Sequence, residues 1–112
     1  MPPVDHPVNE WYDGSMTMNE VQEMIELAYG AKDRELTLAE QMMWLQEEVG
    51  ELAQAIRKGT DEDVKLEVCD VFARMFAITL ELDVDVELLM TNRYLKGCPK
   101  CDASVCVCDR SR

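Results

Sequence analysis

Apolar residues recur at three- and four-residue steps through the middle of the chain, which is the pattern of an amphipathic helix. The clearest run lies between Thr37 and Gly59. Thr37 and Glu40 have the spacing of a capping box, and Gly59 is a suitable helix stop. The pattern therefore predicts a long helix with one core stripe, made of Leu38, Met42, Leu45, Val49, Leu52 and Ile56.

A second long helix is predicted directly after the first. Thr60 or Asp61 can cap it, and the acidic residues 61–63 suit the positive end of the helix dipole. Because the connection is short, the two helices are predicted to be antiparallel neighbours. The predicted core face of the second helix consists of Val64, Val68, Val71, Phe72, Met75, Ile78, Thr79 and Leu82.

Shorter helices are predicted on either side of this pair. One runs from about residue 18 to about residue 31, and Thr17 with Glu20 forms its capping box. The other runs from residue 85 to about residue 95, capped by an aspartate at position 83 or 85. The chain is therefore predicted to contain four helices.

Length and composition are consistent with this prediction. The chain has 112 residues, of which 47% are hydrophobic and only 6% aromatic, so one all-α domain with a modest core is expected. We predict an arm over residues 1–16, a four-helix bundle over residues 17–97 and a cysteine-rich tail over residues 98–112. Trp11 and Tyr12 of the arm are expected to pack on the domain or on another subunit, because so small a bundle is expected to complete its core by oligomerising.

The net charge of −12 argues against binding to long nucleic acids, whose affinity comes from lysine and arginine contacts to phosphates. It does not exclude a small nucleotide, because metal ions can bridge carboxylates to phosphates. No stretch is long and apolar enough to span a membrane. The first 13 residues lack the apolar core of a signal peptide, so a soluble cytoplasmic protein is expected.

Two acidic pairs lie on the two long predicted helices. Glu48 and Glu51 are three residues apart, as are Glu67 and Asp70, and residues at that spacing share a helix face. The first pair precedes the predicted turn by about two helical turns, and the second pair follows it by about as much. Antiparallel packing therefore predicts four carboxylates at one depth, where Mg²⁺ is a natural counterion.

The simpler interpretation is that these acidic side chains are solvated, as most charged residues are. Two features favour a shared site instead. The pairs align in depth across the predicted hairpin, and both lie directly beside apolar stripes rather than opposite them.

The segment Glu47-Glu48-x-x-Glu51, followed by Glu67-x-x-Asp70, resembles the signature of the MazG-like all-α nucleotide pyrophosphohydrolases. The flanking sequence from residue 44 to residue 53 is also similar, and the resemblance extends over residues 17–97. It implies hydrolysis of nucleoside triphosphates to monophosphate and pyrophosphate, and a homodimer or dimer of dimers. It also implies magnesium, or manganese in its place, bound by Glu48, Glu51, Glu67 and Asp70, with Glu47 in an outer shell or on a further ion.

Activation of the attacking water would fall to a carboxylate or to the metal, because no histidine lies near the motifs. Glu47 and Glu48 are the candidate catalytic carboxylates. Trp44 could stack on a base or pack against another helix, and Arg74 could bind phosphate or pair with Asp70. The full set of candidate substrate contacts is Trp44, Lys58, Arg74, Asn92 and Lys96.

Four of the five cysteines crowd the tail as a C-x-x-C and a C-x-C motif: Cys98, Cys101, Cys106 and Cys108. Four thiolates suit a closed, tetrahedral structural zinc site. A disordered or oxidised tail and an iron–sulfur cluster are the alternatives. Cys69, between Val68 and Asp70, is predicted to be a buried thiol.

A second class of function is compatible with the same features. The chain could be a non-catalytic helical adapter whose acidic face and zinc-stabilised tail bind a protein partner. A di-iron carboxylate protein is disfavoured, because such four-helix sites use Glu-x-x-His pairs and the predicted helices contain no histidine.

Overall fold

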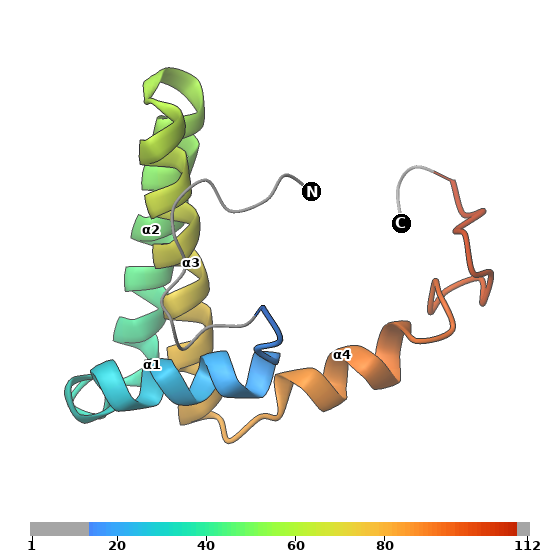
Figure 1. The fold of residues 1–112 in the computed structure, drawn as a ribbon, viewed down its shortest axis with the longest axis horizontal. Coiled ribbons are helices and arrows are strands. Elements are labelled where there is room, and N and C mark those ends of the chain that lie inside the picture. Colours follow the sequence, from blue (N-terminus) through green and yellow to red (C-terminus); the bar gives the residue numbers. More distant parts are fainter. Residues whose placement is uncertain (1–13, 110–112) are drawn as a thin grey trace.

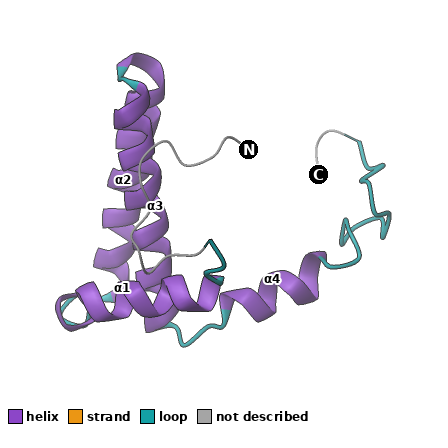
Figure 2. Cartoon of the chain, viewed as in Figure 1, coloured by secondary structure: helices purple, strands orange, loops and turns teal. Residues whose placement is uncertain are grey.

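The computed structural model describes residues 14–109, and this part of the chain contains four α-helices and no strand (Figures 1 and 2). The helices are α1 (Met18–Asp33), α2 (Leu38–Lys58), α3 (Asp61–Glu81) and α4 (Val86–Tyr94). The all-α prediction is therefore confirmed. Most of the predicted arm, with Trp11 and Tyr12, lies outside the described residues.

Side-chain caps explain where the first three helices begin. Thr17, Thr37 and Thr60 each accept a hydrogen bond from the backbone N–H three residues later, and a carboxylate at that position returns the bond. Gly59 ends α2 as predicted. Helix α1 extends two residues beyond the predicted end, because Arg34 continues the hydrogen-bonding pattern by donating to the carbonyl of Gly30.

Helices α2 and α3 form an antiparallel hairpin, and α1 lies across its open end (Figure 1). Helix α4 makes a small contact with α1 and leads away from the hairpin, so that the cysteine tail lies far from the α2–α3 turn. The radius of gyration is 16.6 Å, against about 13 Å expected for a compact chain of this length. The single chain is thus an open assembly of helices.

The predicted core stripes are only partly buried in the single chain. The buried apolar residues are Leu45, Ala55, Phe76, Ala77 and Ile78. Ile56 remains 66% exposed and Phe72 58% exposed, although both were predicted to belong to the core. The physical reason is that α1 covers only one end of the hairpin, while α4 does not lie along it (Figure 1).

Two further observations bear on the sequence predictions. Cys69 is exposed, so the prediction of a buried thiol is wrong. The helices that pack most closely against α3, which are α1 and α2, leave the side chain of Cys69 uncovered in the single chain. None of the helices in residues 14–109 is long and apolar enough to cross a membrane.

Candidate functional site

Three carboxylates from α2 and α3 converge beside the hairpin axis. Glu48 on α2 and Glu67 and Asp70 on α3 each offer an oxygen, and these oxygens all lie within 4.8 Å of one another. The predicted alignment in depth is therefore confirmed for these three residues. It follows from the short connection, which sets the register of the antiparallel helices.

The cluster is electrostatically uncompensated. One oxygen of Glu48 and one of Glu67, the Oε2 atom in each case, are buried and have no hydrogen-bond partner. Burial raises the pKa of both carboxyl groups, and the charges of Glu51 and Asp70 raise it further. Such groups are costly to ionise unless a cation or a proton balances them.

Glu51 lies at the margin of the cluster and Glu47 lies outside it. Glu51 is exposed, but its charge raises the pKa of both Glu48 and Glu67. Glu47 is exposed and does not belong to the group of converging oxygens. A set of hard oxygen donors with two unpartnered members fits a divalent cation such as Mg²⁺.

Lys58 is brought towards this cluster by the end of α2. It lines a surface groove of about 450 Å³ together with Glu51, Gln54, Asp63 and Glu67. The lining of this groove therefore combines a cationic side chain with two of the acidic residues. This is an arrangement that can accept a phosphate group beside a metal ion.

Arg74 forms an ion pair with Asp33 and not the intrahelical pair with Asp70, which was one of the two roles that the sequence left open. Its Nη1 instead lies 3.4 Å from Oδ1 of Asp33, at the end of α1. The guanidinium carbon also lies 5.6 Å from the centroid of the Trp44 ring, in a cation–π contact. Asp33 is buried, and Arg74 provides the charge that a buried carboxylate requires.

Trp44 is 48% exposed, so this ring is not packed into the core of the single chain. Gln41, one turn earlier on α2, is fully buried at 0% exposure. Its Nε2 donates to the backbone carbonyl of Asp33 at 3.3 Å, and its Oε1 has no partner. Neither Asp33 nor Gln41 was predicted to be a site residue, although the position of Gln41 on the same helix face as Trp44 and Glu48 was an available signal.

Asn92 and Lys96 are not brought to the acidic cluster in the single chain. They line a different surface groove of about 800 Å³, together with Leu89, Cys98 and Pro99. The reason is the direction of α4, which leads away from the α2–α3 hairpin (Figure 1).

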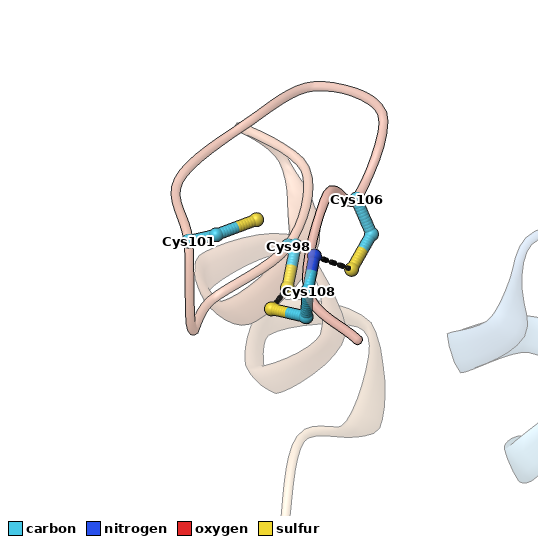
Figure 3. Close-up of side chains that lie close together, drawn as sticks. All are labelled: Cys98, Cys101, Cys106 and Cys108. Atoms are coloured by element: carbon cyan, nitrogen blue, oxygen red, sulfur yellow. Dashed lines mark hydrogen bonds between the residues drawn. The ribbon is translucent and has the colours of Figure 1, made fainter. Parts of the chain in front are cut away.

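A second cluster of metal-binding residue types lies in the tail. The sulfur atoms of Cys98, Cys101, Cys106 and Cys108 all lie within 4.8 Å of one another (Figure 3). Backbone hydrogen bonds lower the pKa of the Cys98 thiol to about 6 and also lower that of Cys101. Hydrogen bonds with the neighbouring sulfurs raise the pKa of Cys108 to about 12.

The chain was compared with models of known protein families. The family model for the MazG nucleotide pyrophosphohydrolase domain matches residues 36–93. The matched segment contains α2, α3 and nearly all of α4, and with them every residue of the acidic cluster. No curated protein sequence matches the chain.

Proposed function

The chain belongs to the MazG nucleotide pyrophosphohydrolase family, and on this basis we propose that it is a magnesium-dependent nucleoside triphosphate pyrophosphohydrolase. The reaction converts a ribo- or deoxyribonucleoside triphosphate and water to the monophosphate and pyrophosphate. Its role would be the housecleaning of nucleotide pools. The observation that carries the proposal is the convergence of carboxylates with two buried, unpartnered oxygens, on Glu48 and Glu67.

The acidic residues that would hold the metal are Glu48, Glu51, Glu67 and Asp70. Hard carboxylate oxygens suit Mg²⁺, and Mn²⁺ can take its place. When bound, the ion would offset the charge of the triphosphate and lower the pKa of a coordinated water. Glu51 is exposed, and its charge raises the pKa of both Glu48 and Glu67, which supports its place in this set.

The chain's own catalytic contribution is the removal of a proton from the attacking water. The water oxygen forms a bond to the α-phosphorus, and the bond from that phosphorus to the oxygen bridging to the β-phosphorus breaks. Pyrophosphate leaves with that bridging oxygen. Glu48, whose pKa is raised by burial, and Glu47, which is exposed next to it, are the candidate proton acceptors.

Three side chains near the hairpin are proposed substrate contacts. Lys58 is proposed to contact the phosphates, and its place in the lining of the groove that contains Glu51 and Glu67 supports this. The exposed ring of Trp44 is available to stack on a base. Arg74 is proposed to orient that ring through the cation–π contact and to contribute positive charge at its face.

We propose a homodimer or homotetramer as the functional form. Met42, Val49 and Ile56 repeat at seven-residue intervals on α2, and all three are at least 41% exposed. Val68 and Met75 on α3 and Leu82 directly after its end repeat in the same way and are at least 37% exposed. A second copy of the chain could cover this stripe, and it could also bring its Asn92 and Lys96 to the acidic cluster.

The test is pyrophosphate release from a panel of ribo- and deoxyribonucleoside triphosphates, measured with and without Mg²⁺. Turnover is expected only with the metal. Replacement of one ligand, as Glu51→Gln or Glu67→Gln, is expected to lower turnover by at least about 100-fold. Glu62→Gln is the matched control, because Glu62 lies on α3 outside the cluster and pairs with Lys65.

Loss of turnover in the ligand variants, with normal turnover in the control, would support the proposed enzyme. Absence of turnover with every triphosphate, from folded protein with Mg²⁺ present, would overturn it. That result would favour the non-catalytic adapter, in which the acidic face binds a protein partner.

A further inference from the structure

The cysteine tail carries a second site that the pyrophosphohydrolase reaction does not use. Its sulfur atoms come from Cys98, Cys101, Cys106 and Cys108 and point towards a common centre (Figure 3). The site follows α4, which leads away from the hairpin that holds the acidic cluster (Figure 1). It also lies beyond residues 36–93, the segment that matches the family model.

A tight backbone turn builds the first half of this site. The Cys98 N–H donates to the carbonyl of Ala103 at 3.0 Å, and the Asp102 N–H donates to the carbonyl of Cys98 at 2.8 Å. Asp102 adopts a left-handed conformation with φ of 59°, which lets the chain reverse directly after the C-x-x-C motif. The turn thus holds Cys98 and Cys101 on the same side of the loop.

Gly97 permits this turn to close. Its φ is +108°, and a Cβ atom there would lie 2.3 Å from the carbonyl oxygen of Ala103 and 2.6 Å from the Cα of Ser104. Only glycine fits so close an approach of two backbone segments. The local sequence is therefore adapted to the compact loop and not only to the presence of cysteines.

A backbone N–H group is directed at one of the sulfur atoms. The Cys108 N–H donates to Cys106 Sγ at 3.4 Å (Figure 3). Such donors stabilise thiolate charge, and thiolate is the form of cysteine that binds metals. A cluster of thiolates in turn requires a cation to offset their mutual repulsion.

The sulfur spacing fits a metal better than it fits disulfides. Cys98 Sγ and Cys108 Sγ are 3.9 Å apart, whereas a disulfide bond requires about 2.05 Å. Tetrahedral zinc with Zn–S bonds of about 2.3 Å has sulfur–sulfur edges of about 3.8 Å. The observed separation therefore matches one edge of such a tetrahedron.

Apolar packing does not account for the compact tail. Val105 is 80% exposed and Val107 is 77% exposed, and residues 95–109 contain no helix or strand. A loop without an apolar core or regular secondary structure needs another source of stability. We propose that Cys98, Cys101, Cys106 and Cys108 bind one structural zinc ion, which folds the tail that follows α4.

The first experiment measures metal bound to the full-length protein, purified under reducing conditions. One zinc ion per chain is expected. When Co²⁺ is added to the metal-free protein, the solution should show the visible absorption of tetrahedral cobalt together with thiolate charge-transfer bands. The double variant Cys98→Ser/Cys108→Ser should lose both signals. Cys69→Ser is the matched control, because Cys69 is exposed on α3 and outside the cluster.

A second measurement reports folding of the tail itself. Zinc removal should increase proteolytic cleavage within residues 97–109 by at least about 10-fold, while the helical circular dichroism changes little. Iron with sulfide in place of zinc, two disulfides by mass, or zinc retained by the double variant would each overturn the proposal. These measurements do not depend on catalysis, so a negative result for zinc and a negative result for the proposed reaction can be told apart.

Discussion

Arg74 on α3 reaches across to Asp33 at the end of α1, with 3.4 Å between Nη1 and Oδ1. The two residues are 41 positions apart in the sequence. Both side chains are largely buried, at 18% and 11% exposure. The ion pair therefore joins α1 to the hairpin one turn away from Asp70, and it holds Arg74 against the Trp44 ring.

Loss of this ion pair is expected to destabilise the fold. Arg74→Ala leaves Asp33 buried without its cation, and breaking a buried pair in this way costs about 3 kcal/mol. Urea unfolding followed by circular dichroism measures the change in the free energy of unfolding. Glu62→Ala, which breaks the exposed pair with Lys65, should cost less than about 1 kcal/mol. Equal effects of the two substitutions would contradict the structural role of Arg74.

The hairpin could be predicted from the sequence because its determinants are local. Capping boxes such as Thr37 with Glu40 specify where helices begin, and a short connection requires antiparallel neighbours. The register of the hairpin then brings Glu48 level with Glu67 and Asp70. Periodicity and spacing alone were sufficient for this part of the candidate site.

The remaining features depend on tertiary packing and could not be predicted. The pairing of Arg74 with Asp33 follows from the way α1 crosses the hairpin, which no local motif specifies. An apolar stripe that contains Ile56 indicates burial but does not distinguish the chain's own core from an interface between subunits. The position of Asn92 likewise depends on the direction of α4.

Removal of one carboxylate from the acidic cluster is expected to stabilise the metal-free protein. In Glu48→Gln, a half-buried position loses the charge that partial burial and the neighbours Glu51 and Asp70 disfavour. The melting temperature in EDTA at pH 7 should rise by roughly 1–3 °C. Addition of Mg²⁺ should stabilise the native protein but not this variant. A lower melting temperature for the variant in EDTA would show that the cluster is not strained.

The same cluster should make the stability of the metal-free protein depend on pH. Because the folded-state pKa values of Glu48 and Glu67 are raised, the unfolded chain loses these protons first as the pH rises. Their contribution to stability is therefore largest at low pH and is lost as the pH rises from about 4.3, the ordinary glutamate value, through the raised values.

Other carboxylates change the stability with pH in the opposite direction, so their contribution must be subtracted from the measured pH dependence. The pKa of Glu40 is lowered by its hydrogen bond with the Thr37 backbone, so Glu40 contributes stability that is lost as the pH falls. The measurement is therefore the melting temperature from pH 4 to pH 8, for native protein and for Glu48→Gln/Glu67→Gln. The melting temperature of the variant should increase relative to that of the native protein as the pH rises. Parallel curves would contradict the raised pKa values.

The exposed apolar stripe predicts that a polar substitution will dissociate the assembly. Ile56 is 66% exposed on α2, so Ile56→Asp should disturb the single chain little and an intersubunit contact strongly. Light scattering coupled to size-exclusion chromatography should report a dimer or tetramer for the native protein and a smaller species for the variant. Leu27→Asp on α1, where Leu27 is 88% exposed and outside the stripe, is the control. A native protein that is monomeric at every concentration would contradict the proposed interface.

Lys58 provides a test of where the phosphates bind. It shares the groove with Glu51 and Glu67, so its ammonium group is expected to contact the triphosphate equally in the ground state and the transition state. Lys58→Ala should then raise KM by about 10-fold and leave kcat within about twofold. This pattern is expected when a contact made equally with the bound substrate and with the transition state is lost. Lys32→Ala is the control, because Lys32 is exposed in the last turn of α1 and does not line this groove. An unchanged KM would place the triphosphate elsewhere, whereas a loss confined to kcat would assign Lys58 to stabilisation of the transition state.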